Sequence, residues 1–477
     1  MHLLEHNCRR FCMRRLPQQL FDIYALSLPR GHGFGRAGPI EVWGSDDGIA
    51  YGVVTQNTET HSFGCLVARR QLDDVWVVVL EVHGLVSKVV ALHALEVAIK
   101  EGEPREPLPA NTAGRPPLHD LKGRVPGDLF DSLRRPFHHM AAWTINQLYL
   151  ALPSPDANWA GDFQTENFHT RMWEAHLLAA FREQGMLVTQ PERSPDFLLQ
   201  NRAGAAAWVE AVTANPRVRF KHFNAEPSEP PTDILERTLG PAASRFAKTL
   251  RTKLQKSYHL APHVLGNPFA IALADFHAPS SMVWSRNALI SYLYALQPSM
   301  EAGHVRVTLA SEELSLQGEE KIPAGLFRSS VCCGLSAVIF TNTCSISKFY
   351  RVPISGGAMD DAYRYIRLGS IWDRTPGAIE GLPFCLDIAS QEYRALWPQG
   401  YEPWSADLEV FHNPYAKHPF PRTLLPEATH WFQQGENIEC ASHYETAILR
   451  SQTLVLPRNK PIPSIEEIRA MFTSSES

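Results

Sequence analysis

One short apolar stretch with a single acidic residue at its centre limits the folds open to this chain more than any other feature. Residues 207–213 read Ala-Trp-Val-Glu-Ala-Val-Thr, a composition typical of a buried strand. A charge inside such a strand is costly unless it is paired, protonated or bound to a metal. Glu210 therefore predicts a strand that carries a partnered or functional carboxylate into the protein interior.

The segments on either side of this strand predict a sheet between helices. In chain order we expect a helix over 168–184, strands over 186–189, 195–199 and 207–213, a helix over 242–258 and a strand over 269–274. The order favours an α/β fold (α+β in a strict count) with a central mixed sheet flanked by helices. We assign this core to residues 161–300.

The rest of the chain divides by pattern and composition. Residues 39–101 predict a small module of four meandering strands followed by a helix. Residues 102–160 predict a proline-rich linker, with six prolines and four glycines up to residue 127, and then a helix over 128–152 kinked at Pro136. Residues 1–38 read as an irregular N-terminus. Residues 301–477 have no assigned role and are expected to pack on the core.

Composition excludes several classes of protein. The chain of 477 residues has a formal net charge of −5, whereas proteins that coat nucleic acid non-specifically are usually basic. Eight cysteines without a Cys-x-x-Cys pair argue against a disulfide framework or a zinc finger and favour a reducing, cytoplasmic location. No apolar run reaches the 18 residues of a membrane span, so no membrane partner is expected. The arginine-rich start lacks the apolar segment of a secretory signal, while an organelle presequence stays open.

A second carboxylate accompanies Glu210. Asp196 precedes it by fourteen residues, follows a proline and begins a predicted strand. The turn at 201–204 fits two adjacent antiparallel strands, which would bring the carboxylates of Asp196 and Glu210 together. Two such oxygen ligands, completed by water and a phosphate, make a typical Mg²⁺ or Mn²⁺ site.

On these residues the chain resembles the PD-(D/E)XK, or restriction-endonuclease-like, nuclease superfamily. The resemblance rests on Pro195-Asp196, on Glu210 in an apolar strand and on the element order, and it covers about residues 160–280. More loosely, the whole chain is similar to uncharacterised bacterial proteins that carry such a core. The resemblance implies metal-dependent hydrolysis of phosphodiester bonds, leaving a 5′-phosphate and a 3′-hydroxyl.

The chain departs from the superfamily pattern at the position two residues after the glutamate. There the pattern has a lysine that helps to activate water, and this chain has Val212. Some superfamily members are similar in placing the lysine on the following helix. On a helical wheel centred on Leu250, Lys253 falls at about −60°, at the edge of the buried stripe, whereas Lys256 and Lys248 face solvent. Lys253 is therefore the candidate replacement, and a solvated surface lysine is the alternative.

The resemblance also implies a glutamate near the metal on the first helix. Glu174 borders the apolar stripe there, with Glu166 as a competitor. Residues 215–260 hold nine Lys or Arg against four acids, which fits a local patch facing phosphates or a plain solvated helix face.

We therefore expect a divalent-metal-dependent nuclease with Glu174, Asp196, Glu210 and Lys253 as catalytic residues. Asp196 and Glu210 hold the metal in this hypothesis, and DNA is favoured over RNA. The alternative is a catalytically inactive module of the same fold that binds nucleic acid or protein. A hydrolase acting on another phosphate ester is a third hypothesis, and a homodimer is left open.

Overall fold

A computed structural model describes the chain over residues 13–17, 37–101, 105–216, 218–223, 230–301, 304–309, 313–314, 322–375, 381–434 and 437–461, with 464 and 467. The chain forms two compact units. The first comprises Met1–Asp120 with Tyr149–Leu152, and the second comprises Leu121–Leu148 with Pro153–Ser477.

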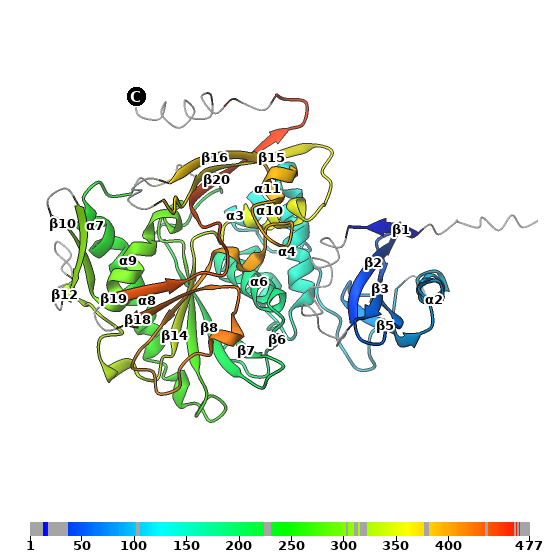
Figure 1. The fold of residues 1–477 in the computed structure, drawn as a ribbon, viewed down its shortest axis with the longest axis horizontal. Helices are drawn as coiled ribbons and strands as arrows, with labels where there is room; N and C mark the ends of the chain where they lie inside the picture. Colours follow the sequence, from blue (N-terminus) through cyan, green and yellow to red (C-terminus); the bar gives the residue numbers. More distant parts are fainter. Residues whose placement is uncertain are drawn as a thin grey trace, which may run out of the picture. The chain divides into compact units, whose positions relative to one another are not determined.

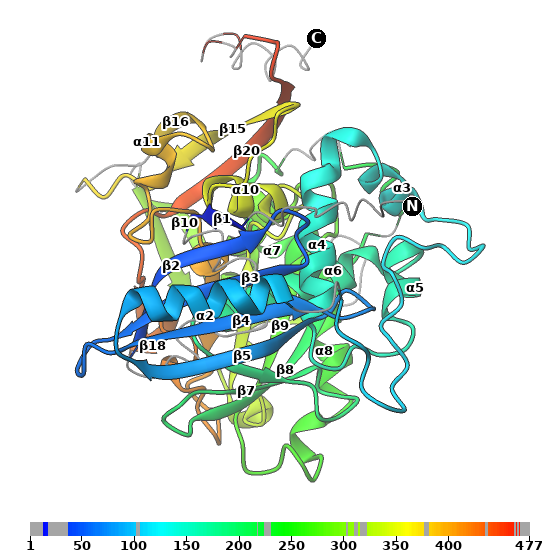
Figure 2. The same cartoon turned by 90° about the vertical axis from the view of Figure 1, so that its right-hand side faces the viewer.

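The first unit is an antiparallel sheet of five strands in sequence order. They are β1 (Met13–Leu16), β2 (Ala37–Ser45), β3 (Ala50–Asn57), β4 (Phe63–Arg70) and β5 (Trp76–Leu85). Helix α2 (Lys88–Glu101) crosses one face of this sheet (Figure 2). Gly52 allows the close approach, because a Cβ there would lie 2.9 Å from Cγ of Leu95 on the helix.

The predicted meander with a following helix is confirmed in this unit. The expectation of an irregular segment over residues 1–38 is wrong for residues 13–16, which form β1. That strand pairs with β2 through Met13 opposite Ser45. Such a pairing between distant residues leaves no periodic signal in four residues of sequence.

The second unit is built on an eight-stranded mixed sheet. Its spatial order is β19-β18-β17-β14-β9-β8-β7-β6. The strands span β6 (Leu187–Thr189), β7 (Phe197–Gln200), β8 (Ala206–Ala214), β9 (Phe269–Asp275), β14 (Ala337–Thr341), β17 (Leu408–His412), β18 (Thr429–Gln434) and β19 (Asn437–Ala441). Strands β8, β9 and β14 run parallel to one another, as do β17 and β18, and the other neighbours are antiparallel.

Helices cover both faces of this sheet, so the predicted mixed sheet flanked by helices is confirmed. Helix α6 (Phe168–Glu183) lies on one face, where the indole of Trp173 donates to the carbonyl of Ala272 in β9 (Figure 1). Helices α8 (Pro241–Leu254) and α9 (Met282–Tyr294) lie on the other. There Phe246 and Leu250 of α8 pack into one apolar core with Trp208 and Val212 of β8. Trp208 and Val212 therefore face the layer of α8 and α9, and successive side chains of β8 point alternately to the two faces of the sheet.

Shorter elements complete the second unit. They include α3 (Asp128–Leu133), η2 (Pro136–His138), α4 (His139–Ala151), α5 (Trp159–Gln164), α7 (Ile234–Leu239), η3 (Tyr258–Leu260), α10 (Lys348–Ser355) and α11 (Gln391–Arg394). A three-stranded sheet has the order β16 (Leu382–Asp387), β15 (Tyr363–Ile371) and β20 (Ile448–Pro457). The predicted break at Pro136 falls between α3 and α4. None of the helices in the described ranges is long and apolar enough to cross a membrane.

Two sequence-based boundaries differ from the structure. The sheet continues past residue 300, since β14, β17, β18 and β19 extend it beyond β9. The helix expected over 242–258 ends at Leu254, because Ser257 adopts a left-handed conformation (φ 52°) that turns the chain.

Candidate active site at the free edge of β8

The pairing of β7 with β8 places the two predicted carboxylates opposite each other. Phe197 of β7 is in register with Val209 of β8, so the next positions in this antiparallel register are Asp196 and Glu210. Because β7 begins at Phe197, the described sheet leaves β8 beyond Glu210 with a neighbouring strand, β9, on one side only. The backbone N–H of Ala211 points to the open side and donates to Oδ2 of Asp196 at 2.7 Å. Asp196 and Glu210 therefore occupy adjacent register positions at a free strand edge.

Lys253 reaches this edge from α8. Its Nζ lies 2.7 Å from Oε1 of Glu210. The glutamate side chain is 5% exposed and that of Lys253 is 26% exposed, so the pair is shielded but open to solvent on the lysine side. The helical wheel had placed Lys253 at the edge of the buried stripe, and its side chain does turn inward.

A second neighbour of Glu210 is Tyr258. Oε2 of Glu210 is buried and has no hydrogen bond of regular geometry to any described residue. Burial, the negative charges of Glu210 and Asp196, and an interaction of the Tyr258 hydroxyl with the Glu210 carboxylate all raise the pKa of Tyr258. The early end of α8 brings Tyr258 to this position, which the sequence had assigned to a continuing helix. A buried carboxylate that has only Lys253 and Tyr258 beside it in the described residues is a place where a cation would be stabilised.

The pKa of Asp196 reflects first its burial and then the neighbouring carboxylates. Burial and the charges of Glu210 and Glu174 raise this pKa well above its ordinary value, against the opposing effects of the Ala211 N–H and Lys253. Mutual repulsion of this kind is typical of carboxylates that share a site. Among the described residues, no group of three or more His, Cys, Asp or Glu side chains is placed to hold a metal. A metal here would rely on Asp196 and Glu210, with water or substrate oxygens completing its shell.

Glu174 is fixed by two neighbours that the sequence analysis missed. The indole of Trp159 donates to its Oε2 at 2.7 Å, and Arg171 donates to its Oε1 at 3.0 Å. Burial raises the pKa of Glu174, while Arg171 and Trp159 lower it. The i, i+3 spacing of Arg171 and Glu174 is a sequence signal for this contact, whereas nothing in the sequence indicates Trp159. Glu166, the competitor, is 69% exposed and pairs with Arg219 at 3.4 Å.

A basic cleft of about 390 Å³ adjoins these residues. Its lining includes three cations of α8, Arg245, Lys248 and Lys253, with Thr170 and Thr213. The two threonine hydroxyls lie 2.9 Å apart, across the contact between α6 and β8. The lining described here contains no acidic side chain. Cations and hydroxyls around an open edge are groups that bind phosphate oxygens.

Another acidic residue of the sheet has a different arrangement. Asp275, at the end of β9, accepts from Ser285 at 2.6 Å and lies 2.7 Å from Nδ1 of His277. Both of its oxygens are thereby engaged within the layer of α9. We therefore treat Asp275 as a structural residue.

Comparisons with known proteins add no assignment. No family model, curated protein or solved structure significantly matches this chain.

Proposed function

We propose that this chain is a divalent-metal-dependent nuclease with a restriction-endonuclease-like core. The observation that carries the proposal is the convergence of Asp196, Glu210 and Lys253 at the free edge of β8. The core elements α6, β6, β7, β8, α8 and β9 follow in the order typical of that superfamily. The adjoining basic cleft supports a phosphodiester substrate.

Asp196 and Glu210 would hold Mg²⁺ or Mn²⁺. The burial of Glu210 and the raised pKa of Asp196 fit a site that gains from a cation. Carboxylate oxygens are the ligands that these ions prefer. When bound, such a metal polarises a phosphate and lowers the pKa of a bound water.

The remaining residues have roles that follow from their positions. Lys253 would orient the attacking water and offset the negative charge that develops on the phosphorus oxygens, in place of the lysine absent at Val212. Glu174, held by Arg171, would support Asp196 and the water shell around the metal. Arg245 and Lys248 would bind the nucleic acid backbone on either side of the scissile bond.

The test is cleavage of end-labelled duplex DNA, single-stranded DNA and RNA in Mn²⁺ or Mg²⁺. We expect cleavage with the metal, with DNA preferred, and none in EDTA. Asp196→Asn and Lys253→Met should each lower the rate at least about 100-fold, the usual range for losing such groups. Lys256→Met is the matched control, because Lys256 follows α8 but does not line the cleft. Equal activity of Lys253→Met and Lys256→Met would contradict the assigned role of Lys253.

A second candidate function is suggested by Val212. Without a lysine on the strand itself, the fold would serve as an inactive module that binds nucleic acid or protein. In that case labelled DNA binds to the chain, and Arg245→Gln weakens the binding. No cleavage product forms with either Mn²⁺ or Mg²⁺. Sedimentation of the same samples would test the homodimer that the sequence left open.

A further inference from the structure

A larger cavity, of about 680 Å³, lies in the second unit outside the candidate active site. It opens where β9 and β14 end, since Phe276 directly follows β9 and Asn342 directly follows β14. Its volume falls in the range of roughly 300–1,000 Å³ that holds small organic ligands. The residues that line it do not include Asp196, Glu210 or Lys253.

Flat rings form one wall of this cavity. His169 stacks on Phe276 with ring centroids 4.0 Å apart and an angle of 6°, and Phe220 meets the edge of His169 at 5.6 Å. His138 packs against Phe223 at 5.1 Å. Aromatic faces grouped in this way favour a planar ligand that can stack.

Burial favours the neutral form of two histidines of this wall, His138 and His169. Burial lowers the pKa of His138 to about 4 and that of His169 to about 3. His138 is 3% exposed, and its Nδ1 has no hydrogen-bond partner among the described residues. A buried ring nitrogen without a partner is costly, so His138 adds an unsatisfied polar group to this part of the fold.

The opposite wall is the edge of strand β20. All its residues from Ile448 to Pro457 except Leu449 line the cavity. Because consecutive side chains of a strand point to opposite faces, a cavity bordered by nearly all of them lies along the strand's edge. The other edge of β20 pairs with β15, and β20 ends its sheet. No strand of the described sheets pairs with the second edge of β20, and the carbonyl of Leu449 accepts from Asn342 at 3.4 Å. Backbone donors and acceptors alternate along such an edge and match the donor and acceptor pattern of a heterocyclic base.

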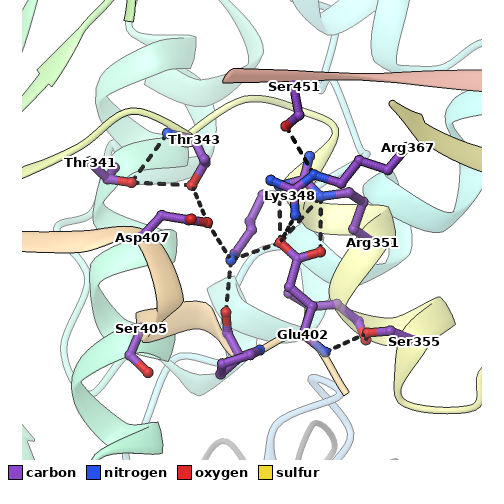
Figure 3. A network of polar contacts seen from close by, with 12 residues as sticks. Thr341, Thr343, Lys348, Arg351, Ser355, Arg367, Glu402, Ser405, Asp407 and Ser451 are labelled. Atoms are coloured by element: carbon purple, nitrogen blue, oxygen red, sulfur yellow. Dashed lines mark hydrogen bonds and ion pairs between the residues drawn. The ribbon is translucent and has the colours of Figure 1, made fainter. Parts of the chain in front are cut away.

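The charge of the lining is positive. The described lining contains Arg351 and Arg450 and no Asp, Glu or Lys. Arg450 is exposed, while Arg351 is held by Glu402, 2.9 Å from its Nε (Figure 3). Behind Arg351 lies a buried network of five charged side chains, Lys348, Arg351, Arg367, Glu402 and Asp407. Three cations share two carboxylates within this group, which favours an anion in the cavity.

We propose that this cavity binds a nucleoside monophosphate, with the base between the rings and the edge of β20, and the phosphate at Arg450. The site is separate from the metal-dependent site and does not depend on the proposed nuclease activity. A stacking wall, a free strand edge and a cationic end match the three parts of such a ligand. A nucleoside alone or inorganic phosphate alone would use only part of them.

The test is isothermal titration of the full chain in EDTA, which removes any metal-mediated binding at Asp196 and Glu210. The probes are AMP, GMP, CMP and UMP, the four nucleosides, and inorganic phosphate. At least one monophosphate should bind at least tenfold more tightly than its nucleoside and than phosphate. Arg450→Gln should remove most of that difference, whereas Arg328→Gln, an exposed arginine outside the lining, should leave it unchanged. Phe220→Leu should weaken the binding of nucleoside and nucleotide alike.

Three results would overturn the proposal. They are no binding of any monophosphate at 1 mM, equal affinity for phosphate and nucleotide, and a nucleotide affinity that neither Arg450→Gln nor Phe220→Leu changes. Circular dichroism of each variant shows whether it is folded. Since cleavage assays measure a different site, failure of the nuclease proposal would leave these results interpretable.

Discussion

The ammonium group of Lys253 lies 2.7 Å from a carboxylate oxygen of Glu210, although 43 positions separate the two residues in the sequence. Glu210 in turn faces Asp196 across the register of β7 and β8. Lys253 pairs directly with Glu210, while the charges of Glu210 and Asp196 repel each other, and this repulsion has measurable consequences for stability.

Asp196→Asn should stabilise the metal-free protein at neutral pH. The raised pKa of Asp196 means that its charged form is disfavoured in the folded state. The asparagine keeps an oxygen for the Ala211 N–H and cannot be ionised, so a gain in the free energy of unfolding is expected. A carboxyl whose folded pKa is raised loses its stabilising contribution as the pH rises through that pKa. The gain should therefore shrink as the pH falls toward about 4, which urea denaturation at several pH values would measure.

Mn²⁺ should raise the melting temperature of the wild-type chain. A ligand at about 100 times its Kd stabilises the folded state by roughly 2.7 kcal/mol. Asp196→Asn and Glu210→Gln should lose this response, and Glu166→Gln should keep it because Glu166 is exposed and outside the site. A response that survives both Asp196→Asn and Glu210→Gln would place the metal elsewhere.

Glu402→Gln should destabilise the second unit strongly. Burial pushes the pKa of Glu402 up, but Arg351, Lys348 and Arg367 together hold it well below its ordinary value. Removing this charge leaves buried cations with too few partners, at a cost of about 3–5 kcal/mol. Denaturation in urea at pH 7 measures the loss, with the exposed Glu392→Gln as control. A loss under 1 kcal/mol would mean that Glu402 does not hold the network together.

His176→Leu should stabilise the protein and reduce its sensitivity to acid. His176 is fully buried, and neither ring nitrogen has a partner among the described residues. Burial, with the charges of Lys348 and Arg351, lowers its pKa well below 6.5. The apolar replacement removes an unsatisfied group worth about 1–3 kcal/mol.

The pH dependence of the same variant gives an independent check. Below about pH 6.5 the unfolded chain binds a proton at His176 that the folded chain does not, so wild-type stability falls by up to about 1.4 kcal/mol per pH unit. The free energy of unfolding of the leucine variant should therefore fall less than that of the wild type between pH 6.5 and 5. The exposed His443→Leu should follow the wild type, and identical slopes for all three proteins would argue against the assignment.

The sequence predicted those parts of the site that local periodicity encodes. Helical spacing alone placed Lys253 at the edge of the buried stripe, and the short apolar run around Glu210 placed it in a strand. Tyr258 was misplaced because its i+4 spacing continues the helix pattern, whereas the turn depends on the backbone of Ser257. Trp159 and the rings around the larger cavity come from separate segments, so only tertiary packing brings them together.

The neighbours of the C-terminal strands in the sheet also could not be predicted from the sequence. Strand β14 has five buried residues and β17 has four of five, and short apolar runs of this kind do not reveal their neighbours. Nothing local indicates that β14 pairs with β9, more than sixty residues earlier. Sheet membership past residue 300 therefore required the structure.

The position of β9 inside the sheet limits how the candidate nuclease core can be isolated. All seven residues of β9 are buried, and β14 covers the edge that β8 leaves free. A fragment that stops near residue 300 would expose this apolar edge as a template for pairing with other chains. Such a fragment would contain every proposed catalytic residue, yet we expect it to aggregate during expression, so studies of this activity need the C-terminal strands.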